Sequence, residues 1–147
     1  MYYETEHDRE NAREVFESWL RAIEKETGYS PETIELPPYH HFDFAIGSSV
    51  SGSFFPLAWI EVKTRSNAST KYPSLLIENM KFETIQNEHS EGRMIFILVK
   101  FTDGIFAYRY NPRHAITEAL GGRIDRDNPA DFGFNRYIPM EHFRKIM

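Results

Sequence analysis

Two acidic side chains and one amine are placed to converge on a single point of a β-sheet. Glu61 and Lys63 lie two residues apart in an apolar segment, and Asp43 lies in the apolar segment before it. Residues two apart in a strand point to one face, so Glu61 and Lys63 share a face, while Ile60 and Val62 point to the other. An acid and an amine therefore stand side by side above a hydrophobic underside, which indicates a binding site.

Magnesium chemistry suits these side chains. Converging carboxylates are costly to keep ionised unless a cation lies between them, and Mg²⁺ takes one or two carboxylates while leaving positions for water and substrate phosphate. We therefore expect Asp43 and Glu61 to hold Mg²⁺ or Mn²⁺, with the Val62 carbonyl as a further ligand. Lys63 would orient the attacking water or stabilise negative charge on a phosphate. The alternative is an Asp in a turn and a surface Glu–Lys pair, which would contribute little.

Hydrophobic periodicity predicts the elements that must position these residues. Apolar residues three and four apart predict helices, alternation predicts strands, and Asp103-Gly104 is a hairpin turn signal. The expected elements are a helix over 7–26, strands over 33–36, 39–46 and 57–64 with a turn over 47–53, a loop over 65–73, a helix over 74–90, and strands over 94–101 and 105–110. The short links between the first three strands predict an antiparallel meander.

The C-terminal segment is less regular. Residues 123–126 and 136–138 are expected to form a final hairpin, and residues 140–146 a short helix. The chain has 147 residues, which suits a single domain with a core over about 8–110 and an extension over about 111–147. The element order predicts a mixed α/β sheet with a helix on each flank.

The segments His-Phe-Asp-Phe-Ala-Ile at 41–46 and Ala-Trp-Ile-Glu-Val-Lys-Thr-Arg at 58–65 resemble the PD-(D/E)XK nuclease superfamily. Its members include restriction endonucleases, archaeal Holliday junction resolvases and phage exonucleases. The resemblance extends to the element order over residues 8–110 and implies a restriction endonuclease-like αβββαβ core. It also implies that Asp43 and Glu61 bind the metal and that Lys63 is the catalytic lysine. Phe42 stands where the family name has Pro, a departure that many members share.

Members of this superfamily often carry another acid on the first helix. Glu17 lies eleven residues before Gly28, a spacing similar to that of junction resolvases, which makes it a further catalytic candidate. Glu10 and Glu14 are rivals for this role. An exposed helical glutamate is the plainer interpretation of all three.

Several basic and polar residues are candidate nucleic-acid contacts. The second helix of the superfamily often points such residues toward the active site, and the loop before it is rich in them. The candidates are Arg65, Lys71, Lys81 and Gln86, and Arg123 and Arg126 are placed to touch phosphate. An ordinary solvated face is the alternative.

Composition limits these hypotheses. The formal net charge of −5 argues mildly against tight, non-specific nucleic-acid binding, which depends on a basic surface. The chain has no Cys, which excludes disulfides and thiolate zinc sites and fits an intracellular protein, while the resemblance allows a phage-encoded one. No apolar run approaches the length of a membrane span, and residues 1–11 are unlike a signal peptide.

The leading hypothesis is a metal-dependent endonuclease or exonuclease that hydrolyses DNA phosphodiester bonds, as a resolvase-like, repair or phage-type enzyme. We expect a homodimer, because one active site cuts one strand, with the aromatic segment 132–143 as the interface. The alternative is a non-catalytic nucleic-acid- or protein-binding module on the same fold, which the acidic balance favours slightly. The set of Asp43, Glu61 and Lys63 argues against a binding module, which does not need it.

Overall fold

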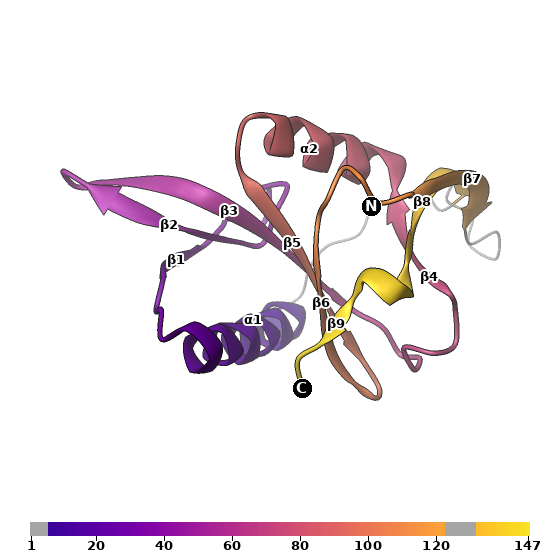
Figure 1. Cartoon of the computed structure of the whole chain (residues 1–147), viewed down its shortest axis with the longest axis horizontal. Helices are drawn as coiled ribbons and strands as arrows, with labels where there is room; N and C mark the ends of the chain where they lie inside the picture. Colours follow the sequence, from indigo (N-terminus) through magenta and orange to yellow (C-terminus); the bar gives the residue numbers. More distant parts are fainter. Residues whose placement is uncertain (1–5, 123–131) are drawn as a thin grey trace.

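The computed structural model describes residues 6–122 and 132–147 (Figure 1). In chain order the elements are α1 (Glu6–Thr27), β1 (Glu32–Glu35), β2 (Phe44–Val50), β3 (Ser53–Thr64), β4 (Ser74–Glu78), α2 (Asn79–Ser90), β5 (Met94–Phe101), β6 (Gly104–Arg109), β7 (Thr117–Gly122), β8 (Phe132–Pro139), the 3-10 helix η2 (Met140–His142) and β9 (Arg144–Lys145). The order of the helices and of the main strands confirms the predicted mixed α/β class.

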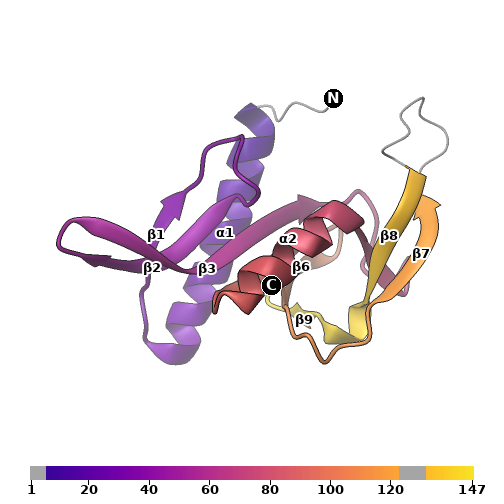
Figure 2. The same cartoon turned by 90° about the horizontal axis from the view of Figure 1, so that it is seen from above.

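A six-stranded sheet in the order β1-β2-β3-β5-β6-β9 forms the centre of the molecule. Strands β1, β2 and β3 pair antiparallel, which confirms the predicted meander, whereas β3 and β5 run parallel. Parallel neighbours need a long crossover connection, which here contains α2 and places Glu61 of β3 beside Ile97 of β5. Strands β4, β8 and β7 form a separate three-stranded sheet to one side (Figure 2).

The two helices cover opposite faces of the central sheet (Figure 1). On the α1 face, the Phe16 ring stacks on Phe44 at 4.2 Å between centroids, and Trp19 packs against Phe96. On the α2 face, Phe82 belongs to a second buried cluster. Each such fully buried side chain contributes roughly 1.5–3 kcal/mol, so the two layers fix β3 between them.

Residues 74–78 form a strand, so the prediction of a helix over 74–90 was wrong at its start. Leu75 and Ile77 are buried and alternate with more exposed neighbours, which is the period of a strand, and both pair with β8. Helix α2 begins only at Asn79, and the apolar side chain of Met80 in its first turn is exposed. The partner strand comes much later in the chain, so local periodicity could not reveal it.

The predicted strand over 39–46 begins only at Phe44. The residues before it form a tight turn, in which the His40 N–H donates to the Pro37 carbonyl and the Phe42 N–H donates to Nδ1 of His40. Phe42 consequently lies in the cluster on the α2 face, whereas Phe44 lies in the cluster on the α1 face; a continuous strand over 39–46 would have placed both on one face.

The turn predicted over 47–53 is shorter than expected. It consists of Ser51 and Gly52, with φ of 52° and 81°. Two residues with positive φ form the mirror-image turn that matches strand twist, so β2 and β3 continue on either side as one long hairpin.

The C-terminal segment joins both sheets. The expected terminal helix over 140–146 was wrong, because η2 ends at His142 and β9 then pairs with β6. Strands β7 and β8 form a final hairpin that contains the predicted arm 136–138, whereas Arg123 and Arg126 lie outside the described residues. Within the described ranges, neither helix has the length and apolar character needed to cross a bilayer.

Candidate active site

Strand β3 presents Glu61 and Lys63 on one face, as alternation predicted. Ile60 is fully buried on the α1 face, and Val62 packs against the same cluster. Glu61 and Lys63 are only partly buried, and Glu61 contacts Lys81 of α2, which places the pair on the α2 face. The apolar underside therefore fixes the strand, while the charged side remains accessible.

Asp43 immediately precedes β2 and is tied to β3 by two hydrogen bonds. Its N–H donates to the Ile60 carbonyl at 2.9 Å, and its Oδ2 accepts from the Val62 N–H at 2.7 Å. The carboxylate of Asp43 thus lies against the backbone between Glu61 and Lys63. The fold brings the three predicted residues together from positions that are far apart in sequence.

The backbone of Val62 also faces Asp43. Because the N–H and C=O of one strand residue point to the same side, the Val62 carbonyl lies on the side where its N–H meets Asp43. The pairing of β2 with β3 ends at Phe44 and Ile60, so this carbonyl lies beyond the ladder. The carboxylates of Asp43 and Glu61 and the Val62 carbonyl are hard oxygen donors, which fits Mg²⁺.

Over the described ranges, no group of three or more His, Cys, Asp and Glu side chains is placed to hold a metal ion. Mg²⁺ does not require such a group, because it binds through one or two carboxylates and completes its shell with water and substrate phosphate. A site with two carboxylates and one backbone carbonyl matches this preference.

The Lys81 ammonium lies beside Glu61, at the start of α2. Its Nζ is 3.0 Å from Oε2 of Glu61, and it also donates to the His41 carbonyl. The side chains of Lys81 and Glu61 are only 22% and 14% exposed, so the pair is shielded from bulk water. The positive charge of Lys81 therefore lies at the point where the sequence predicts a metal ion beside Glu61.

Lys63 has a perturbed acid–base equilibrium. Burial lowers the pKa of the Lys63 amine below its usual range. The negative charge of Glu61 opposes this shift, whereas the positive charges of Arg65 and Lys81 increase it. A lysine with a lowered pKa beside a carboxylate is typical of a functional site.

The predicted nucleic-acid contacts divide into two groups. Arg65 follows β3, and burial lowers the pKa of its guanidinium while the charge of Glu61 opposes the shift, so Arg65 adjoins the site together with Lys81. Lys71 and Gln86 are exposed, and no contact in the described part of the chain brings either to Glu61.

Helix α1 does not bring Glu17 to this site. Glu17 is exposed, as are its rivals Glu10 and Glu14, and none of them contacts the site within the described ranges. The first turns of the helix approach instead, since Arg9 lines a small depression together with Asp43. An acid contributed by the first helix stays a prediction.

An ionic network behind Asp43 was missed from the sequence. Arg9 and Arg13 of α1 each hydrogen bond to Glu35, both at 2.5 Å, and Arg13 is the main cause that lowers the pKa of Glu35 to about 2. The next residue, Leu36, donates its N–H to the Asp43 carbonyl at 2.9 Å. The network thus fixes the chain that holds Asp43, and two arginines four apart on one helix face were the available signal.

Comparisons with known proteins identify the family and the fold of the chain. A family model described as "Phage putative PDDEXK endonuclease" matches residues 1–146, while no curated protein matches the chain. A solved structure of D212, a nuclease from a fusellovirus, has a TM-score of 0.60 at 14% identity and covers 99% of this chain and 90% of its own. Hjc, a Holliday junction resolvase from Archaeoglobus fulgidus, has a TM-score of 0.47 at 13% identity, with coverages of 94% and 95%. The family model confirms the expected resemblance, and the similarity to the D212 structure confirms the mixed-sheet fold.

Proposed function

The chain belongs to the phage PDDEXK endonuclease family, and from this premise we propose that it is a metal-dependent nuclease that hydrolyses DNA phosphodiester bonds. The observation that supports this most is the hydrogen bond from the Val62 N–H to Asp43, because it joins the carboxylate to the strand that carries Glu61 and Lys63. A module that only binds DNA has no need for two carboxylates and a lysine at one point.

Asp43 and Glu61 are the proposed ligands, with the Val62 carbonyl between them. Mg²⁺ or Mn²⁺, when bound, supplies Lewis acidity toward the scissile phosphate and lowers the pKa of a water molecule. The protein's own contribution is orientation. The Val62 N–H fixes the Asp43 carboxylate, and the Lys81 ammonium balances the charge of Glu61 at the place that a divalent ion would take.

Lys63 is the proposed catalytic amine. It lies on the same strand face as Glu61, so it reaches a phosphate held at the carboxylates from the α2 side. Its partial burial excludes water, and a fixed positive charge in such a place stabilises developing negative charge more strongly than it would in bulk water. In this role Lys63 orients the attacking water and stabilises the phosphate.

Contacts to the DNA backbone are proposed for four residues around the site: Arg65, Lys71, Lys81 and Gln86. Arg65 and Lys81 adjoin the carboxylates, and the exposed Lys71 and Gln86 extend the contact outward. Since the net charge of the chain is −5, favourable contacts with phosphate must come from local groups of positive charge, and Arg65, Lys71 and Lys81 are such a group.

We propose a homodimer, because one site of this kind cuts one strand. Strand β7 is an edge of the smaller sheet. Its residue Leu120 is the cross-strand partner of Phe134 on the neighbouring strand β8. Both side chains are exposed, at 59% and 62%, so they form an apolar patch. A second copy that covers this patch would pair two active sites for the two strands of a duplex.

The test is a cleavage assay with supercoiled, linear and branched DNA, with Mg²⁺, with Mn²⁺ and with EDTA. The native chain is compared with Asp43→Asn and Lys63→Met, which keep side-chain size, and with Lys100→Met on the exposed side of β5 as a matched control. We expect the native chain to cleave DNA only with a divalent ion. Asp43→Asn and Lys63→Met should lose cleavage, and the control Lys100→Met should keep full activity.

Cutting by Asp43→Asn and Lys63→Met at the native rate would refute the site. DNA binding without cleavage of any of the three substrates, at either metal, would refute the nuclease proposal and favour a binding module on the same fold.

A further inference from the structure

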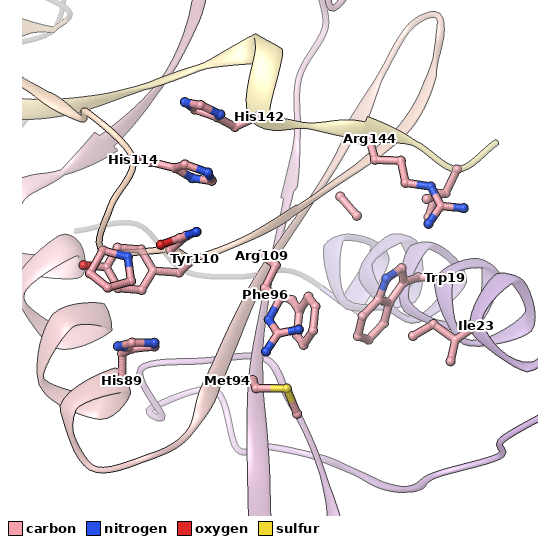
Figure 3. Close-up of a pocket in the computed structure, with 14 residues that line it drawn as sticks. Trp19, Ile23, His89, Met94, Phe96, Arg109, Tyr110, His114, His142 and Arg144 are labelled. Atoms are coloured by element: carbon pink, nitrogen blue, oxygen red, sulfur yellow. The ribbon is translucent and has the colours of Figure 1, made fainter. Parts of the chain in front are cut away.

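A second cleft opens on the α1 face of the sheet, away from the carboxylates. It has a volume of about 690 Å³ and extends from α1 across the start of β5 and the end of β6 to the C-terminal segment (Figure 3). Phe96 lines it and packs on Trp19 of α1, whereas Glu61 and Lys63 point to the other face. The cleft therefore shares no residue with the proposed active site.

Among the described residues, those that line the cleft are basic, aromatic or aliphatic and include no Asp or Glu. Arg109 and Arg144 supply permanent positive charge, and His89, His114 and His142 add nitrogen donors (Figure 3). Such a lining is unusual in a chain with a net charge of −5. Arginine forks match the oxygens of a phosphate, so the charge pattern points to an anionic ligand.

Strand register places the two arginines on the same side of the sheet. Arg144 of β9 is the partner of Ala107, and Arg109 follows two residues later on β6, opposite Phe96. The backbones of diagonal neighbours of this kind lie roughly 7–8 Å apart, which is within the reach of two long side chains around one phosphate. Arg144 is held by Glu26 at the end of α1, so Glu26 orients this arginine and competes for it.

A pair of stacked imidazoles bounds the cleft at one end. The rings of His114 and His142 are 3.7 Å apart between centroids and only 8° from parallel (Figure 3). The Asn111 N–H donates to the Tyr108 hydroxyl at 3.4 Å, so that hydroxyl can donate to Nδ1 of His114 at 2.9 Å. His114 then carries its ring proton on Nε2. Its neutral state is favoured because burial and the neighbouring His142 lower its pKa.

We propose that this cleft is a nucleotide subsite, which binds one unit of a single DNA strand with its phosphate between Arg109 and Arg144 and its base against the His114–His142 pair. Flat imidazole rings are surfaces on which nucleobases stack, and arginines carry the backbone charge. The inference goes beyond phosphodiester hydrolysis, because binding here requires neither the metal ligands nor Lys63.

The test is binding of a 5′-phosphorylated tetrathymidylate to the full chain in EDTA at low salt, by isothermal titration. EDTA removes the divalent ions and with them the metal-dependent binding at the carboxylate site, so that the cleft variants report on the remaining binding. We expect Arg109→Gln to weaken binding roughly tenfold, the loss of about one charge-assisted hydrogen bond. Arg113→Gln, an exposed arginine outside the cleft, is the matched control and should bind as the native chain does.

Two further variants test which part of the ligand the cleft binds. Glu26→Gln releases Arg144 and should tighten binding, and His142→Ala should weaken the tetrathymidylate but not inorganic phosphate. The proposal is overturned if Arg109→Gln and Arg113→Gln lose affinity for the tetrathymidylate equally. It is also overturned if the native chain does not bind the tetrathymidylate. A change of sedimentation in His142→Ala without a change in affinity would instead identify the cleft as a protein interface and also overturn it.

These outcomes are independent of the nuclease assay. A chain that binds the tetrathymidylate through Arg109 but cuts no DNA refutes the nuclease proposal alone. A chain that cuts DNA but binds this oligonucleotide equally well in every variant refutes the nucleotide subsite alone.

Discussion

The Val62 N–H donates a hydrogen bond of 2.7 Å to Oδ2 of Asp43, and this contact joins two segments that are 19 residues apart. Val62 lies between Glu61 and Lys63, so the bond sets the position of the Asp43 carboxylate relative to both. Because the acceptor is a carboxylate and the donor is a backbone group, the contact depends on the side chain of Asp43 but not on that of Val62. Substitutions of Asp43 can therefore separate its structural role from its chemical one.

Asp43→Asn and Asp43→Ala should differ in stability but not in activity. Asn keeps an oxygen that accepts from the Val62 N–H, whereas Ala leaves this donor without its partner, at a cost of about 1–3 kcal/mol. Neither variant keeps the negative charge, so both should lose cleavage. Urea unfolding together with the cleavage assay checks this, and an active Asp43→Asn would contradict the metal-ligand role.

Lys63→Met should stabilise the protein at neutral pH while abolishing cleavage. Burial lowers the pKa of Lys63 below 10.5, so the unfolded chain holds this proton more tightly than the folded chain. The buried charge thus destabilises the native chain below the lowered pKa, and stability rises with pH between that pKa and 10.5. Lys63→Met removes this destabilisation, because Met fills similar space without a charge.

Chemical unfolding from pH 7 upward measures this effect. The advantage of Lys63→Met should shrink as the pH rises from the lowered pKa through 10.5, above which the native lysine is neutral in both states. Lys100→Met on the exposed side of β5 should stay within about 0.5 kcal/mol of the native chain throughout. If Lys63→Met is less stable than the native chain at pH 7, the charge of Lys63 does not destabilise the folded chain.

Lys81→Met should tighten the binding of Mg²⁺. The Lys81 ammonium lies 3.0 Å from Oε2 of Glu61 and competes there with a divalent cation. Loss of a competing charge worth about 1 kcal/mol corresponds to a gain of roughly fivefold in affinity. Isothermal titration with MgCl₂ measures it without DNA, and Lys71→Met, an exposed lysine, is the control. Weaker Mg²⁺ binding would mean that Lys81 supports the site instead.

The strand that carries the site could be predicted from the sequence, because its evidence is local. Ile60 and Val62 alternate with Glu61 and Lys63, and alternation alone assigns the faces that the structure shows. Strand β4 could not be predicted in this way. Its buried Leu75 becomes a strand residue only through pairing with β8, far along the chain, and a short apolar run before a helix looks like part of that helix.

The side-chain contacts around the carboxylates were only partly predictable, because they too depend on segments that are far apart in the chain. Lys81 was expected at the active-site side of the second helix, but its contact with Glu61 depends on how α2 packs on the sheet. The bonds from Arg9 and Arg13 to Glu35 depend on the packing of α1 beside β1. Side-chain partners that come from different elements require the tertiary structure, whereas the faces of one strand do not.

Glu35→Gln should lower stability at pH 7 but not at strongly acidic pH. The pKa of Glu35 is lowered to about 2 by its hydrogen bonds to Arg13 and Arg9, so the stabilisation is present above 4.5 and is lost as the pH falls through about 2. Because a third of the side chain is exposed, solvent screening limits the effect to about 1 kcal/mol. Urea unfolding measures it, and Glu17→Gln, an exposed glutamate of α1, should show no such loss.

Phe134→Ser should convert the proposed homodimer into a monomer. Phe134 faces Leu120 across β7 and β8, and both are exposed at the edge of the smaller sheet, where a second copy would cover them. A stable interface buries about 800 Å² on each partner, so a polar residue at its centre weakens association strongly. Sedimentation velocity checks this against Phe55→Ser, a phenylalanine of β3 that is 54% exposed, which should stay dimeric. A native chain that sediments as a monomer would exclude the homodimer. A dimer that Phe55→Ser disrupts and Phe134→Ser does not would place the interface elsewhere.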